Sequence, residues 1–318
     1  MTNTNPFSTP PAPPLDPATP NRSPSRRFWA FPVTRIVLYL LLFALIAQTL
    51  AAAGLGVLHL LHYRHGHDRE LVGILGEGLT AAGAILAFWI MVRFADKRPW
   101  AAAGWTRHGM MRDLLCGAAG GAAVLSVSVG VFRLLGWYHV IAVTPSVLLL
   151  TPLLLYFVVA VFEETLFRRY MFQTLESRWG SGVALAATSL LFGLAHLGNP
   201  APGATPLGRM AGPLFICLEA GLPFGAAYLL TRRWWLPIGM HWAWDYCEGP
   251  LYGCPDSGTH DPHTLLHARF SGPFWVTGGS FGPEAGVVVL IVGTPAGLLL
   301  LRAAVQRGRW QPRPRRAT

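Results

Sequence analysis

The stretch that decides the fold is residues 153–168, LLLYFVVAVFEETLFR, in which ten apolar residues run directly into two glutamates and, four positions on, an arginine. A run of this kind suits a bilayer, where one helix needs about 20 mostly apolar residues. A charged side chain at the centre of such a helix costs about 2.5–3.5 kcal/mol on insertion scales, so charges persist there mainly when they pair or serve function. The stretch therefore indicates a membrane helix with paired or functional charges.

The composition of the whole chain also indicates a membrane protein. Of 318 residues, 52% are hydrophobic and 13% are charged, and the mean hydropathy is +0.40. Soluble domains carry about 25% charged residues. The formal net charge of +10 does not indicate nucleic-acid binding, because the cations recur between apolar runs and do not form one patch.

Apolar runs of spanning length predict an all-α, polytopic membrane bundle of about eight transmembrane helices. They lie at roughly 32–60, 71–94, 113–136, 144–172, 182–198, 211–231, 235–249 and 284–304. The third contains Gly117 and Gly121, whose spacing suits close helix packing. The long loop at 250–283 is predicted to cap the outer face of the bundle.

The distribution of cations tests this topology. With the N-terminus in the cytoplasm, 20 of the 25 lysines and arginines fall in cytoplasmic segments and 5 fall outside. This bias predicts that both termini are cytoplasmic, since positive residues favour that side. The composition of the tail and the preference for Arg over Lys are typical of a bacterial protein, so we expect an integral protein of the bacterial plasma membrane.

Composition divides the chain into four parts. Residues 1–27 are rich in Pro, Ser, Thr and Asn and have little to bury, which predicts a disordered cytoplasmic tail. Residues 28–140 hold the N-terminal transmembrane helices. Residues 141–304 form the membrane core that carries the polar motifs, and residues 305–318 form a basic C-terminal tail.

The first polar motif comes directly after the apolar run. Glu163 and Glu164 point about 100° apart on a helix of 3.6 residues per turn. Glu164 and Arg168 are spaced i, i+4 with the acid first, the favourable order for an ion pair. Glu163 has no such partner and is left to face a cavity as base, acid or ligand. The alternative is that both glutamates only mark the cytoplasmic end of the fourth helix.

Two further polar groups occur in predicted membrane helices. His196 ends the sequence FGLAH at 192–196, and HWAWD at 241–245 places His241 and Asp245 on one helix face. An acid beside a histidine can fix its tautomer and support its charged form. The structural alternatives are a histidine satisfied in the core and a helix-capping pair.

Distance along the chain brings these groups together. The sequence WGSG at 179–182 predicts a turn between the fourth and fifth helices. Glu163 lies 17 residues before Gly180 and His196 lies 16 after it, so in an antiparallel hairpin they have equal depth. His241 starts near the cytoplasmic side, and it can join them if the polar stretch 168–178 extends into the cytoplasm.

The three motifs in order resemble the CPBP family of intramembrane proteases, which includes the CAAX prenyl endopeptidases. Over roughly residues 140–300, the matching positions are Glu163, Glu164, Arg168, Phe192, His196, His241 and Asp245.

The resemblance implies a glutamate mechanism without a metal or cofactor. Glu163 would be the general base and His196 would help to hold a water, while His241 and Asp245 would stabilise the oxyanion. Glu164, Arg168 and Phe192 would support the site. The family often has Asn at the position of Asp245. An ionised Asp accepts instead of donating, so here it would orient a protonated His241 or stay protonated itself.

Four alternatives stay open. Glu163, His196 and His241 could form a zinc site with one open position. A non-catalytic membrane scaffold, immunity protein or transporter would use the same residues structurally or as a proton relay. The histidines in two loops (His59, His62, His65 and His67; His260, His263 and His267) could bind metal, although solvated loop residues explain them, and Cys247 could pair with Cys254. The expected partners are membrane lipids and a peptide or membrane-protein substrate, with no nucleic acid.

Overall fold

The computed structural model describes residues 31–60, 69–99, 104, 106–199 and 205–314. The predicted disordered tail at 1–27 and the predicted loop histidines His62, His65 and His67 lie outside the described residues. The longer helices are α2 (Pro32–Leu60), α3 (Arg69–Ile90), α4 (Met110–Leu134), α5 (Leu150–Glu164), α6 (Phe172–Ala195), α7 (Pro206–Glu219), α8 (Gly221–Thr231), α9 (Trp235–Tyr246) and α11 (Val287–Gln306). The shorter elements are η1 (Met91–Ala95), β1 (Tyr138–Val143), η2 (Val147–Leu149), η3 (Thr165–Met171), η4 (His196–Gly198), η5 (Cys247–Leu251), β2 (Leu266–Phe270), α10 (Phe274–Thr277) and η6 (Pro283–Ala285).

The predicted all-α membrane bundle is confirmed. Six helical stretches of the described chain are long and apolar enough to span a membrane: Pro32–Leu60, Val72–Ala95, Met110–Leu134, Val147–Gly198, Pro206–Thr231 and Val287–Gln306. The fourth of these contains two predicted spans, because the helix is broken at Gly180, where φ is 79°. Beyond this break the chain returns, since the rings of Phe167 and Phe192 lie 5.1 Å apart. The predicted seventh span is α9, a shorter helix of 12 residues.

Helices α4 and α9 pack at the closest distance that two backbones allow. A Cβ atom on Gly117 would lie 2.2 Å from the carbonyl oxygen of Leu236, and one on Gly121 would lie 2.1 Å from that of Met240. Gly239 on α9 makes the reciprocal approach to α4, with its Cβ position 2.1 Å from the oxygen of Leu114. The predicted role of the paired glycines is therefore confirmed, and α9 is the partner helix.

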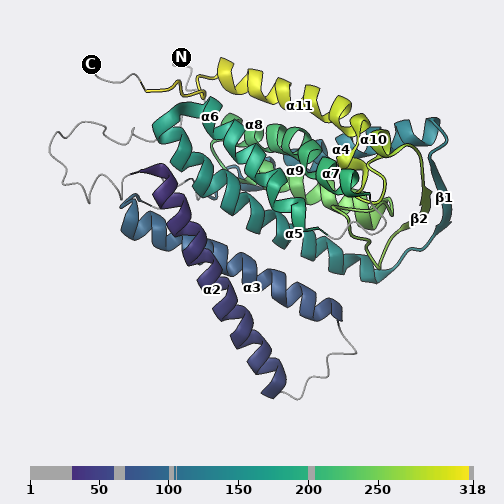
Figure 1. The fold of residues 1–318 in the computed structure, drawn as a ribbon, viewed down its shortest axis with the longest axis horizontal. Helices are drawn as coiled ribbons and strands as arrows, with labels where there is room; N and C mark the ends of the chain where they lie inside the picture. The colour runs from purple at the N-terminus through teal and green to yellow at the C-terminus, as the bar shows by residue number, and fades with distance from the viewer. Residues whose placement is uncertain (1–30, 61–68, 100–103, 105, 200–204, 315–318) are drawn as a thin grey trace, which may run out of the picture.

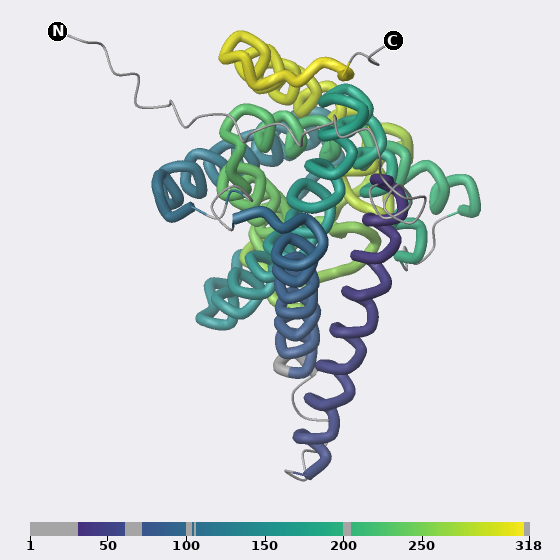
Figure 2. Tube along the Cα trace, turned by 90° about the vertical axis from the view of Figure 1, so that its left-hand side faces the viewer, coloured from purple at the N-terminus to yellow at the C-terminus, as the bar shows by residue number. Residues whose placement is uncertain are grey.

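Helices α2 and α3 form an arm that extends from the rest of the bundle (Figure 2). Apolar side chains cover its outer surface, and Leu41, Leu45 and Leu60 are 64%, 65% and 75% exposed. Such a surface is costly in water but not against hydrocarbon, so this arm fits the predicted contact with membrane lipids.

The two ends of the bundle differ in chemistry. One end holds ion pairs that involve Arg35 with Asp96, Arg232 with Glu176 at 2.5 Å and Arg233 with Asp113 at 2.6 Å. The other end holds the antiparallel pair β1–β2, which lies at the opposite side of the molecule from the C-terminal end of α11 in Figure 1. The arginines at the first end come from segments that the predicted topology places on one side of the membrane. An even number of predicted spans separates any two of these segments. That this side is cytoplasmic stays a prediction.

Most of the polar stretch at 168–178 is covered by other segments of the protein, and its extension into the cytoplasm stays a prediction. Arg168, Arg169 and Glu176 are 1%, 0% and 4% exposed. Neighbouring segments cover the stretch, because Arg98 donates to Gln173 at 3.2 Å and Arg232 pairs with Glu176. The sequence pattern shows the polarity of these residues but not the protein segments that pack over them.

The close packing of α4 on α9 predicts a specific glycine requirement. Gly121→Ala should lower the free energy of unfolding by about 1–3 kcal/mol, the usual cost of overpacking, because its new Cβ meets backbone that cannot move alone. Gly130→Ala is the matched control on the same helix, since nothing lies within 4 Å of its Cβ position. Thermal unfolding in detergent measures both, and equal losses would contradict the predicted interface.

Candidate functional site

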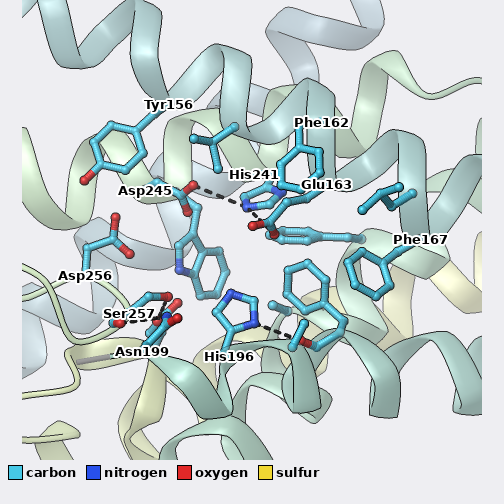
Figure 3. Close-up of a pocket in the computed structure, with 18 of the residues that line it drawn as sticks. Tyr156, Phe162, Glu163, Phe167, His196, Asn199, His241, Asp245, Asp256 and Ser257 are labelled. Atoms are coloured by element: carbon cyan, nitrogen blue, oxygen red, sulfur yellow. Dashed lines mark hydrogen bonds and ion pairs between the residues drawn. The ribbon is translucent and has the colours of Figure 1, made fainter. Parts of the chain in front are cut away.

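A cavity of about 420 Å³ lies inside the helical bundle. All four residues predicted as catalytic line it, namely Glu163, His196, His241 and Asp245. Figure 3 shows Glu163, His241 and Asp245 along one wall and His196 on the opposite wall. The sequence therefore placed these side chains in one site correctly, although their roles stay predictions.

The two glutamates are the last two residues of α5, directly before the π-helical segment η3, and they face different directions. Glu163 faces the cavity with 18% of its side chain exposed, whereas Glu164 is fully buried. One carboxylate oxygen of Glu163, Oε2, is buried without a hydrogen-bond donor. Its nearest ionisable partner is Nε2 of His241, at 3.8 Å. Glu163 therefore lines the cavity with a carboxylate of which one oxygen, Oε2, is turned towards His241 and has no hydrogen-bond donor.

Glu164 forms the predicted brace and also holds a second residue. Its Oε1 accepts a hydrogen bond of 2.8 Å from Arg168 Nη1 and lies 3.1 Å from His241 Nδ1. The guanidinium of Arg168 stacks over Phe192, 4.2 Å from the ring centroid. Phe192 is thus part of the support that the motif predicted. This buried group of side chains connects α5 and η3 to α6 and α9.

Other side chains contact both nitrogens and one face of the His241 imidazole. Its Nδ1 faces Glu164, and its Nε2 lies 3.3 Å from Asp245 Oδ2. Its ring stacks on Phe224 with 5.0 Å between centroids. The i, i+4 spacing of His241 and Asp245 thus does produce a contact, and it fixes one orientation of the ring in the cavity.

His196 has a defined tautomer. Its Nδ1 lies 2.8 Å from the carbonyl oxygen of Phe192. A carbonyl oxygen can only accept, so Nδ1 carries a proton, and in the neutral ring Nε2 then has the lone pair. In Figure 3 the second nitrogen of the His196 ring points into the cavity, opposite Glu163. His196 can therefore hold a water by accepting one of its hydrogens.

Several residues of the cavity were missed by the sequence reasoning. They are Glu77, Tyr156, Asn199, Asp256, Ser257 and Glu284. Glu77 could have been identified from the sequence as a candidate, since it is a lone carboxylate in the second predicted span. Asp256 and Ser257 come from the loop at 250–283, which closes one side of the cavity. Burial raises the pKa of Asp256 well above its usual range and that of Glu284 to about 7.

The geometry also bears on the predicted metal and disulfide alternatives. The ligand atoms of Glu163, His196 and His241 do not all lie within 4.8 Å of one another. In the described chain, the one group of three ligands that does is Glu248, Asp256 and Glu284. Cys247 and Cys254 are both buried and are not joined by a disulfide.

Comparison with known proteins identifies one family. Residues 144–247 match the model of a family described as type II CAAX prenyl endopeptidase Rce1-like. The matched segment contains all seven positions on which the resemblance in sequence rests. No curated protein and no solved structure matches the chain.

The buried brace predicts a strong effect of Arg168 on stability. Arg168→Met should lower the free energy of unfolding by about 3–5 kcal/mol, since it leaves the charge of Glu164 buried with a weaker set of partners. Glu164→Gln in the same chain should recover part of this loss. Arg112→Met is the control, because Arg112 is 55% exposed and its pair with Asp113 should contribute less than about 1 kcal/mol. Chemical unfolding in detergent compares the variants, and a stable Arg168→Met protein would contradict the brace.

Proposed function

We propose that this protein is an intramembrane endopeptidase that uses a glutamate-activated water, because residues 144–247 match the type II CAAX prenyl endopeptidase Rce1-like family and lie in a membrane bundle. The observation that carries the proposal is the position of Glu163. Its side chain is 18% exposed and lines a cavity whose opposite wall carries His196. A water between them would be oriented by both groups.

The reaction then needs only residues of this chain. Glu163 takes a proton from the water as its oxygen attacks the scissile carbonyl, and a tetrahedral intermediate forms. The C–N bond breaks as Glu163 returns that proton to the leaving amine. The products are a new carboxyl group and a free amine, and Glu163 ends in its starting state.

The oxyanion is stabilised from the wall that holds His241. Glu164 and Asp245 orient the ring, and its Nε2–H is the donor nearest to Glu163. A donor of this kind contributes about 3 kcal/mol to the transition state. Asp245 acts through His241 in this scheme and is a positioning residue.

The charges of the cavity favour an internal peptide bond. Five of the lining residues are carboxylic acids, and the lining includes no lysine or arginine among the described residues. A free C-terminal carboxylate beside the scissile bond would find no cation there, whereas a neutral peptide or a basic side chain would be tolerated. The aromatic rings of Phe162, Phe167 and Phe224 provide an apolar wall for a membrane-protein or lipidated segment.

Glu163→Gln tests the proposed mechanism. The amide keeps the shape of the side chain but cannot accept the proton, so hydrolysis should fall by about 10²–10⁴-fold. Membrane peptides from cells with wild-type and variant protein are compared by mass spectrometry, and uncut substrates should accumulate with the variant. Thermal unfolding confirms that the variant is folded.

A folded Glu163→Gln protein with full activity would contradict the peptidase proposal and favour a scaffold. The zinc alternative gives a different result. Inhibition of the purified wild-type protein by 1,10-phenanthroline, reversed by added Zn²⁺, would contradict the metal-free mechanism.

Substitutions of Asp245 test its positioning role. Asp245→Asn keeps an oxygen that accepts from His241, so activity should stay within about tenfold of wild type. Asp245→Ala removes the acceptor and should lower activity by about 10²-fold, the usual effect of losing one oxyanion contact. Initial rates on a cleaved peptide measure both. Equal losses in the two variants would show that the charge of Asp245, and not its hydrogen bond, is needed.

A further inference from the structure

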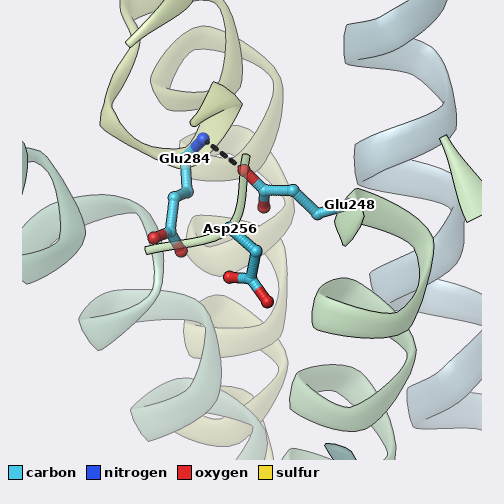
Figure 4. Close-up of side chains that lie close together, drawn as sticks. All are labelled: Glu248, Asp256 and Glu284. Atoms are coloured by element: carbon cyan, nitrogen blue, oxygen red, sulfur yellow. Dashed lines mark hydrogen bonds between the residues drawn. The ribbon is translucent and has the colours of Figure 1, made fainter. Parts of the chain in front are cut away.

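Three carboxylates from separate elements meet beside the catalytic cavity. Glu248 comes from η5, Asp256 from the loop at 250–283, and Glu284 from η6, and each offers an oxygen within 4.8 Å of the others (Figure 4). They are 0%, 6% and 5% exposed. Asp256 and Glu284 also line the cavity, whereas Glu248 lies behind them. The proposed peptidase reaction does not use this cluster.

A fourth carboxylate adds an independent observation. Glu219, at the end of α7, is 0% exposed, and neither of its oxygens has a hydrogen-bond donor. Its charge interacts with that of Glu284, and the charge of Glu248 interacts with that of Glu219 in turn. Burying an unpaired, ionised carboxylate costs several kcal/mol, so a side chain of this kind is compensated either by a bound proton or by a positive charge beside it.

The residues around the cluster supply few hydrogen-bond donors to its carboxylates. The backbone N–H of Glu284 donates to Glu248 Oε1 at 3.1 Å, and the hydroxyl of Ser257 donates to Glu284 Oε1 at 2.5 Å. Oε2 of Glu248 has no donor. Within the described part of the chain, no lysine or arginine forms an ion pair with any of the four carboxylates. The negative charge of the cluster is therefore not balanced by an ion pair with a lysine or arginine among the described residues, although His196 and His241 act on Glu284 from the cavity.

We propose that Glu248, Asp256 and Glu284 form a binding site for a divalent cation of the calcium type, with Glu219 as a fourth acidic neighbour. Calcium takes oxygen ligands at about 2.3–2.6 Å, so two ligands on opposite sides of the ion lie about 5 Å apart. Magnesium, by contrast, demands near-ideal octahedral geometry with bonds of about 2.0–2.1 Å. Calcium also tolerates irregular geometry, which suits ligands from three segments.

The position of the site gives the cation a structural effect. It would join the end of α9, the covering loop and the start of α11 at one point. Gly282 allows this approach, because a Cβ atom there would lie 2.8 Å from Glu248 Oε1 and 2.3 Å from the oxygen of Pro255. Since Asp256 and Glu284 line the cavity, the cation would hold the loop over the catalytic residues.

Direct binding tests the inference. The full-length protein in detergent is stripped with EGTA and dialysed against ⁴⁵Ca²⁺. We expect one calcium per chain, and at least tenfold weaker binding in Glu248→Gln and in Asp256→Asn. Asp261→Asn is the matched control from the same loop, because Asp261 bonds Tyr156 and is not in the cluster, and it should bind within twofold of wild type.

A second measurement needs no cluster variant. Calcium should raise the unfolding temperature of the wild-type protein, and EGTA should reverse the increase. Absence of bound calcium in the wild-type protein, or unchanged binding in both cluster variants, would overturn the inference and leave shared protons as the compensation. Glu163→Gln should bind calcium like the wild type, so a failed peptidase proposal and a failed cation site give different results.

Discussion

The site depends on one carboxylate oxygen, Oε1 of Glu164. It binds the guanidinium of Arg168 and faces Nδ1 of His241, so it joins α5 to α9 inside the bundle. This contact turns Nε2 of His241 towards Glu163 and Asp245. The two adjacent glutamates thus differ, because consecutive helical residues face different directions: Glu164 is buried and contacts Arg168 and His241, whereas Glu163 lines the cavity and is the proposed base.

Two backbone features bring the rest of the site to this point. The break at Gly180 folds α6 back along η3, which sets His196 opposite Glu163. The glycines of α4 allow α9 to approach closely, and α9 carries His241 and Asp245. Neither Gly180 nor the glycines of α4 line the cavity, yet each fixes where a side chain of the candidate site lies. In this bundle, the positions of His196, His241 and Asp245 therefore depend on glycines, which let the backbone turn sharply or approach another helix closely.

Helical periodicity and distance along the chain were enough to predict part of the site. Spacing indicated the pair of Glu164 with Arg168, and equal distances from Gly180 indicated the common depth of Glu163 and His196. Asp256 and Glu284 were missed, because the path of an irregular loop has no periodicity to read. The burial of Arg168 and Glu176 was missed for a related reason, since the covering segments are distant in the chain. The pair β1–β2, with its irregular register between Val140 and Ala142, was also outside what patterning predicts.

Charge explains why the cavity and its covering loop must be considered together. More than half of the chain's 15 acidic residues line the cavity or adjoin it: Glu77, Glu163, Glu164, Glu219, Asp245, Glu248, Asp256 and Glu284. A bundle that only had to span a membrane would be more stable with apolar residues there. Asp256 and Glu284 belong to the cluster and also line the cavity. A cation or proton that neutralises them therefore also changes the electric field at Glu163. A base in this cavity cannot be tuned by its nearest neighbours alone, and the covering loop is therefore part of the site.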